Sequence, residues 1–178
     1  MKAINNKQNM LRFPTASEAE LVGDLINICG LPPTFVSETV GNIMEYMADM
    51  FSNGKSIRIK GIGLLTIKKT NNHNWVGGVD RFLTRAGGVD ILKRKDIIKY
   101  LAGNYKRCDD PVTTYESFWE TLADVIKDRL DNGYEVPIRD VGTIIPGTRG
   151  AKNATWYISP LAQCRLVQME MDMALVDG

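Results

Sequence analysis

The chain has 178 residues, 44% of them hydrophobic and 24% charged, and its 22 basic and 21 acidic residues leave a net charge of +1. This composition is typical of a globular protein and lacks the basic excess expected of a chain whose main work is neutralising phosphates. No apolar run approaches about 18 residues, so no transmembrane helix is expected. The first 14 residues have no apolar core of the signal-peptide type, which argues against secretion.

Residues 1–16 are polar and irregular, and we expect an extended arm that is either disordered alone or ordered against a partner. Ser17 and Glu20 then form a capping box, in which each side chain satisfies a free backbone N–H at the start of a helix. Apolar residues follow at helical spacing until Gly30, which ends this first predicted helix.

A second helix is predicted from Pro33 to Ser52, with proline suited to its first turn. Asn53-Gly54 stops it, because glycine readily takes the left-handed conformation. Residues 57–60 alternate between isoleucine and a basic residue, the pattern of a half-buried strand. Gly61-Ile62-Gly63 then predicts a sharp corner, and residues 64–70 a second strand.

Residues 71–92 fit three structures: a loop, a hairpin, or a strand and its return. They contain two glycine pairs, Gly77-Gly78 and Gly87-Gly88, each followed by Val-Asp. Neither pair leads into the Gly-Lys-Ser/Thr of a phosphate-binding loop, so we interpret both as turns.

The same order of signals returns 79 residues later. Asp131-Asn132-Gly133 again ends a long predicted helix, residues 112–131, and Val141-Gly142-Thr143 again follows a short strand. Pro137 lies within that strand and predicts that the strand has a free edge at this point. A period of about 79 residues indicates two copies of one small unit.

The copies divide the chain into an arm (1–16), a first unit (17–92) and a second unit (93–178). In the second unit a polar turn is predicted at residues 146–153, and Thr155–Ile158 reads as a strand. The tail from residue 161 to 176 fits either a helix or a final strand. The alternation of methionine and acidic residues from Met169 to Met173 favours the strand.

Two helices, a glycine stop, a strand, a Gly-x-Gly corner and a second strand resemble the HU and integration host factor (IHF) family of DNA-bending proteins. The resemblance rests on Asn53–Leu64 and Asn132–Thr143 and covers residues 17–70 and 93–146. It implies an α+β fold of two tandem HU/IHF-like units, each with two helices followed by a small antiparallel β-sheet. Such a chain is similar to a fused pseudo-dimer, or to one half of a larger assembly.

The chain departs from this family where members grip DNA. Family members carry a long arm with an Arg-x-Asn-Pro-type tip whose proline wedges between base pairs. Neither residues 70–92 nor residues 146–155 contain such a tip. The basic residues left as nucleic-acid candidates are Lys68, Lys69, Arg81, Arg85, Lys93, Arg94 and Lys95.

Acidic residues recur at steps of three and four along the predicted helix 112–131. They form either a solvated helix face or a docking surface for a basic partner. The residues are Glu116, Glu120, Asp124, Asp128 and Asp131.

Two functions follow from these observations. The first is a non-catalytic structural protein that uses an HU-like fold for protein–protein contacts, resembling ring components of the tail, neck or portal-proximal region of bacteriophage virions. Its expected partners are copies of itself and other virion proteins, in a virion assembled in the bacterial host cytoplasm. The alternative is a divergent HU/IHF-like protein that binds and bends DNA in the cytoplasm or nucleoid. Because no nucleophile with a neighbouring base can be named, we do not expect an enzyme. We also expect no cofactor, metal, small-molecule substrate or membrane contact.

Overall fold

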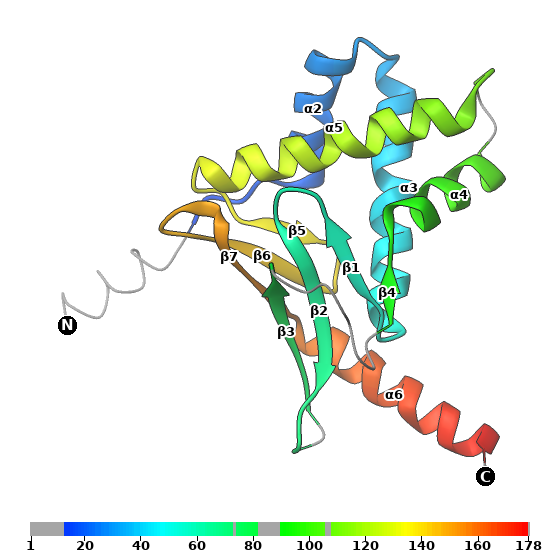
Figure 1. The fold of residues 1–178 in the computed structure, drawn as a ribbon, viewed down its shortest axis with the longest axis vertical. Helices are drawn as coiled ribbons and strands as arrows, with labels where there is room; N and C mark the ends of the chain where they lie inside the picture. Colours follow the sequence, from blue (N-terminus) through cyan, green and yellow to red (C-terminus); the bar gives the residue numbers. More distant parts are fainter. Residues whose placement is uncertain (1–12, 73, 82–89, 106–107, 178) are drawn as a thin grey trace.

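The computed structural model describes residues 13–72, 74–81, 90–105 and 108–177 (Figure 1). These residues form a mixed α+β fold with five helices and two small sheets, one mixed and one antiparallel. None of the helices in this part of the chain is both long and apolar enough to cross a membrane.

The two predicted helices at the start of the chain are confirmed. Helix α2 (Glu18–Cys29) begins after Ser17, whose hydroxyl accepts a hydrogen bond of 3.3 Å from the Glu20 N–H. Helix α3 (Pro33–Ser52) has the predicted bounds. Most of the predicted arm, residues 1–12, lies outside the described residues. Its end pairs with the second half of the same chain, because the Ala16 N–H donates to the Glu135 carbonyl at 2.9 Å.

The junction from helix to strand has the same geometry after α3 and after α5 (Pro111–Asp131). Asn53 and Asn132 each donate from the side chain, at 2.8 Å, to a carbonyl four residues earlier. Gly54 and Gly133 follow with φ of 84° and 83°. A β-carbon is unfavourable at such angles, which is why glycine marks both stops.

The hairpins after these junctions share one pairing register. Strand β1 (Ser56–Ile59) pairs with β2 (Gly63–Lys69), and β5 (Val136–Ile138) pairs with β6 (Gly142–Gly147). Ile57 lies opposite Leu65, and their counterparts 79 residues later, Val136 and Ile144, also lie opposite each other. The sheet order β5-β6-β7 places β5 at an edge, which confirms the prediction from its proline.

The corners inside the two hairpins differ. In the first, Gly61 takes the left-handed conformation with φ of 86°, whereas in the second Arg139 takes it with φ of 43°. Arginine is strained at this angle. The Arg139 guanidinium is held by the Glu18 carboxylate at 2.6 Å and by the Gly41 carbonyl at 3.1 Å.

Of the three structures that the sequence left open for residues 71–92, the structure shows a hairpin that is followed by a short strand. Strand β3 (Trp75–Asp80) returns along β2, and the Thr70 N–H closes the turn on the Asn74 carbonyl at 2.7 Å. Strand β4 (Ile91–Leu92) then pairs parallel to β1 before α4 (Arg94–Asn104) begins. The first sheet is therefore mixed, and the prediction of an antiparallel sheet in each unit is wrong for it. The turn interpretation of Gly77-Gly78 is wrong, because both glycines lie within β3 and pair with β2. The second glycine pair lies outside the described residues.

The polar turn predicted at 146–153 is shorter in the structure, because β6 runs to Gly147 and β7 (Gly150–Ile158) starts at Gly150. Gly150 has φ of 68°, and the Asn153 side chain accepts from the Arg149 N–H at 2.8 Å. The β6–β7 connection is therefore a tight turn.

The prediction of a C-terminal strand from the alternation of methionine and acidic residues is wrong, and the helical alternative is confirmed. Residues Pro160–Asp177 form helix α6. The Ser159 hydroxyl accepts from the Ala162 N–H at 3.1 Å, and proline fits the first turn. Ala162 and Leu166, four residues apart, are buried, so packing at helical spacing overrides the local alternation.

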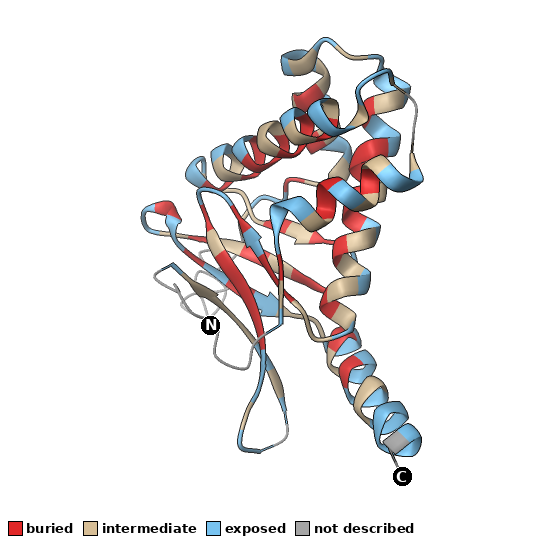
Figure 2. Ribbon diagram, turned by 45° about the vertical axis from the view of Figure 1, so that its right-hand side comes forward, coloured by how far each residue is buried: buried red, intermediate tan, exposed pale blue. Residues whose placement is uncertain are grey.

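One hydrophobic core joins both halves of the chain. Figure 2 shows the buried residues along the facing sides of the helices and the sheets. Tyr46 stacks on Tyr100 with ring centres 3.9 Å apart, and Phe51 lies 4.9 Å from Trp156. At the contact between β3 and β7, a β-carbon on Gly77 would come within 2.6 Å of the Trp156 carbonyl oxygen, so only glycine fits.

Candidate functional site

The two nucleic-acid candidates on β2, Lys68 and Lys69, have different surroundings. Lys68 is exposed, whereas the Lys69 ammonium forms an ion pair and hydrogen bond with the Glu170 carboxylate of α6. Lys69 therefore contributes to the docking of α6. A charge engaged in this way is less available to an external phosphate.

Two further candidates, Arg81 and Arg94, also contact the rest of the chain. The Arg81 guanidinium donates to the carbonyl of Ala154 in β7 at 2.7 Å. Arg94 approaches the carboxylates of Glu120 and Glu116 at 3.1 and 3.7 Å. Both arginines therefore meet oxygen atoms of the protein.

The remaining candidates do not form a cluster. The Lys93 N–H donates to Asp96 at 2.9 Å at the start of α4, so this residue acts as a helix cap through its backbone. Lys95 lines a separate cavity between α4 and α5. Arg85 lies outside the described residues. Among the described candidates, Arg81 lines one cavity with Lys68 and another with Arg94.

Arg81 and Arg94 line a groove of about 540 Å³ at the Gly-x-Gly corner. We call it the corner groove. Among the described residues, its lining holds five cationic side chains and no carboxylate: Arg58, Lys60, Arg81, Arg94 and Lys152. Arg94 already meets Glu116 and Glu120, whereas the exposed Lys60 and Lys152 ammonium groups suit a phosphate or another anion.

Sequence reasoning missed Arg58, Lys60 and Lys152 as members of one site. The alternation in residues 57–60 does predict that Arg58 and Lys60 point away from the core, and both are exposed. Lys152 comes from β7, more than 90 residues further along the chain, and only the packing of the two halves brings it to the groove.

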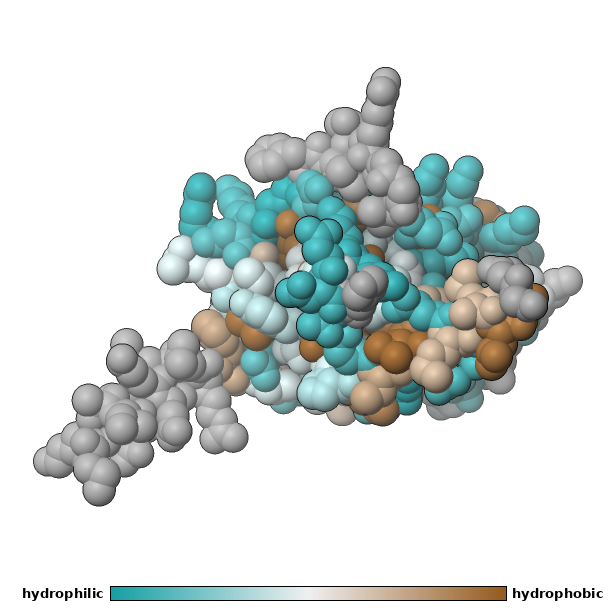
Figure 3. Space-filling view, turned by 90° about the horizontal axis from the view of Figure 1, so that it is seen from below, coloured by the Kyte–Doolittle hydropathy of each residue, from teal (hydrophilic) through white to brown (hydrophobic). Residues whose placement is uncertain are grey.

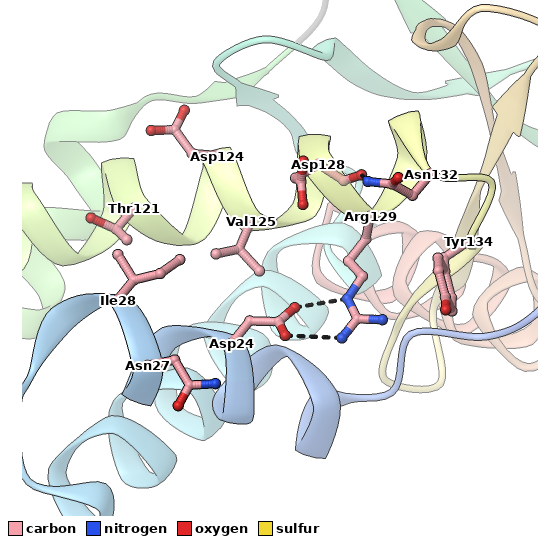
Figure 4. A pocket seen from close by; sticks show the side chains of 10 residues that line it. All are labelled: Asp24, Asn27, Ile28, Thr121, Asp124, Val125, Asp128, Arg129, Asn132 and Tyr134. Atoms are coloured by element: carbon pink, nitrogen blue, oxygen red, sulfur yellow. Dashed lines mark hydrogen bonds and ion pairs between the residues drawn. The ribbon is translucent and has the colours of Figure 1, made fainter.

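A cavity of about 950 Å³ forms a cleft between α2 and α5 (Figure 4). Arg129 crosses it and donates to both Asp24 oxygens, at 2.7 and 2.9 Å. The hydrogen bond to Asp24 raises the pKa of Arg129. The guanidinium also lies over the Tyr134 ring, 4.8 Å from its centre. These contacts hold α2 on α5 and identify Arg129 as a structural clamp.

The acidic residues predicted to form a stripe on α5 make different contacts. Glu116 and Glu120 face Arg94, and Asp131 accepts from Lys127 at 2.7 Å and from the Ala151 N–H at 2.9 Å. The hydrogen bond from Lys127 lowers the pKa of Asp131. Asp124 and Asp128 line the cleft. The stripe therefore mainly fixes neighbouring elements.

Helix α6 has one face packed on the protein and another in solvent. On its inner face, Gln163 accepts from the Trp75 N–H at 2.8 Å, and Glu170 accepts from the Trp75 indole N–H at 2.7 Å. On its outer face, Met171 and Leu175 are 56% and 80% exposed. Figure 3 is seen from the end to which α6 projects, and brown hydrophobic surface gathers at the right, the side on which α6 lies in Figure 1.

The corner groove and the outer face of α6 are thus the two surfaces that we consider for external partners. The corner groove carries positive charge, and the outer face of α6 carries exposed apolar side chains. A comparison with protein-family models finds no match to this chain, and a search of curated proteins finds no matching sequence.

Proposed function

We propose that the chain is a non-catalytic assembly protein built from two tandem HU/IHF-like units. The setting that the resemblance implies, a ring in the tail or neck of a bacteriophage virion, is part of this proposal. The observation that carries it is the outer face of α6, which holds apolar side chains of 43–80% exposure at Leu161, Val167, Met171 and Leu175. Apolar side chains exposed together on one helix face are typical of a protein–protein contact.

The geometry of the hairpins supports assembly over DNA bending. Residues 70–74 connect β2 to β3, and residues 148–149 connect β6 to β7. Neither connection is long enough to reach around a duplex. The recurrence of one pairing register in both halves supports the tandem arrangement.

A concentration series of solution mass tests the assembly function. We expect the light-scattering mass to rise above the 19.9 kDa of one chain as the protein concentration increases from about 1 to 200 µM. Because burial of apolar surface drives this association, the measured mass at a given protein concentration should not fall when salt is added. A mass of 19.9 kDa at every concentration would contradict self-assembly.

The corner groove favours DNA binding as a second candidate function. If this groove binds phosphate, affinity for DNA should fall steeply between 50 and 200 mM salt, since each neutralised phosphate releases counterions. The absence of a mobility shift below about 10 µM protein at 50 mM salt would exclude this function, because non-specific DNA binders reach about 10⁻⁴–10⁻⁶ M even at physiological salt. Micromolar, salt-dependent binding that is lost in a Lys60→Glu, Lys152→Glu variant would instead establish the groove as a DNA site.

A further inference from the structure

The exposed face of α6 has the spacing of a coiled-coil seam. Five residues follow each other at steps of three, four, three and four, and we call them the outer stripe: Leu161, Cys164, Gln168, Met171 and Leu175. All five are exposed, and they lie on the side of the helix opposite the buried Ala162 and Leu166. Residues at this spacing form one continuous line that a second helix can cover.

Two charged residues border the outer stripe. Arg165 and Asp172 are seven residues apart, each directly after a stripe residue, so they fall on the same side of the stripe. Both are exposed. The Gln168 side chain donates to the Asp172 carboxylate at 2.8 Å and holds it beside the stripe.

We propose that the outer stripe binds the outer stripe of a second copy of this chain, with the two α6 helices antiparallel. The inference rests on the proposed assembly function and names the partner. In this arrangement Cys164 of each copy lies level with Leu175 of the other, and Gln168 with Met171.

The charges select the antiparallel direction. With Cys164 level with Leu175 of the second copy, Arg165 of each chain borders Asp172 of the other, and the two-fold axis makes this pair twice. In a parallel pair, each Arg165 lies level with Arg165 of the second copy and each Asp172 with Asp172, so neither charge is level with its opposite. Flanking charges set partner and direction in helix pairs in this way.

Disulfide cross-linking tests the partner and the direction together. We expect Leu175→Cys to form a disulfide-linked dimer under mild oxidation, with the bond mapped by mass spectrometry to Cys164 and residue 175. The wild-type chain should form no Cys164–Cys164 bond, because in the antiparallel pair these residues are 11 positions apart along the axis, or about 16 Å, and a disulfide needs α-carbons within about 7 Å.

Met173→Cys is the matched control. Met173 lies two positions from Met171 and is 57% exposed, but two residues rotate the side chain by about 200° around the helix. We therefore expect no bond between Cys164 and residue 173. Leu175 and Met173 are both exposed, so neither variant disturbs the core.

A charge exchange provides a second readout. Arg165→Asp or Asp172→Arg alone should weaken the dimer severalfold, and the two changes together should restore it, since each restores the opposite pair. A Cys164–Cys164 bond in the wild-type chain would show a parallel pair and overturn the proposal.

The cross-link and the solution mass together separate this interface from the assembly function. A mass that rises while Leu175→Cys forms no bond between Cys164 and residue 175 would overturn this interface but leave the assembly function. A mass of 19.9 kDa at all concentrations would remove both.

Discussion

Trp156→Ala is expected to lower the free energy of unfolding by about 3–5 kcal/mol, the usual cost of removing a large buried aromatic side chain. Trp156 is 1% exposed. From β7, in the second half of the sequence, its ring reaches Phe51 of α3 and covers Gly77 of β3, both in the first half. The cavity left by alanine would therefore open the contact that joins the two halves.

Trp156→Phe separates the volume of this side chain from its polarity. The indole N–H is buried and has no hydrogen-bond partner among the described residues, so it contributes a desolvation cost without a compensating bond. We expect phenylalanine, which keeps an aromatic ring and removes the N–H, to cost less than about 2 kcal/mol. Urea unfolding followed by circular dichroism measures both variants, and an unchanged midpoint for Trp156→Ala would contradict this role.

Gly77→Ala is expected to destabilise the protein by about 1–3 kcal/mol, because a new β-carbon would overpack the contact between β3 and β7. That carbon would come within 2.6 Å of the Trp156 carbonyl oxygen and 2.9 Å of its Cδ1 atom. Because a backbone oxygen and a buried indole cannot move aside easily, the strands must separate.

Gly78→Ala provides a control in the same strand. Its β-carbon would point to the other face and meet only the Thr66 hydroxyl, at 3.2 Å. We expect a change below about 1 kcal/mol, measured in the same urea unfolding experiment. Equal losses for the two variants would show that the effect comes from glycine in a strand and not from the contact with Trp156.

The sequence predicted those parts of the fold that depend on neighbouring residues. Asn53-Gly54 and Asn132-Gly133 end helices through bonds to carbonyls four residues earlier, and such local chemistry is visible in a sequence. The end of the chain was mispredicted for the opposite reason. The alternation of methionine and acid near Met171 is local, whereas the burial of Ala162 and Leu166 that fixes α6 is tertiary.

The candidate surfaces were less predictable than the fold. Outward-facing Arg58 and Lys60 follow from strand alternation, but their grouping with Lys152 needs the packing of distant segments. Lys69 is a plausible phosphate ligand in the sequence, and only the packing of α6 shows that its charge meets Glu170. The outer stripe is visible only when residues 161–176 are a helix, because its steps of three and four have no meaning in a strand.

The proposed function depends on α6 as an assembly surface, and a pair of methionine variants tests this most directly. Met171 and Met173 are 56% and 57% exposed on the same helix, but only Met171 belongs to the outer stripe. Light scattering over a concentration series should show that Met171→Glu raises the dissociation constant at least tenfold, about 1.4 kcal/mol, while Met173→Glu assembles as the wild-type chain does. Equal assembly of Met171→Glu and the wild-type chain would contradict the account.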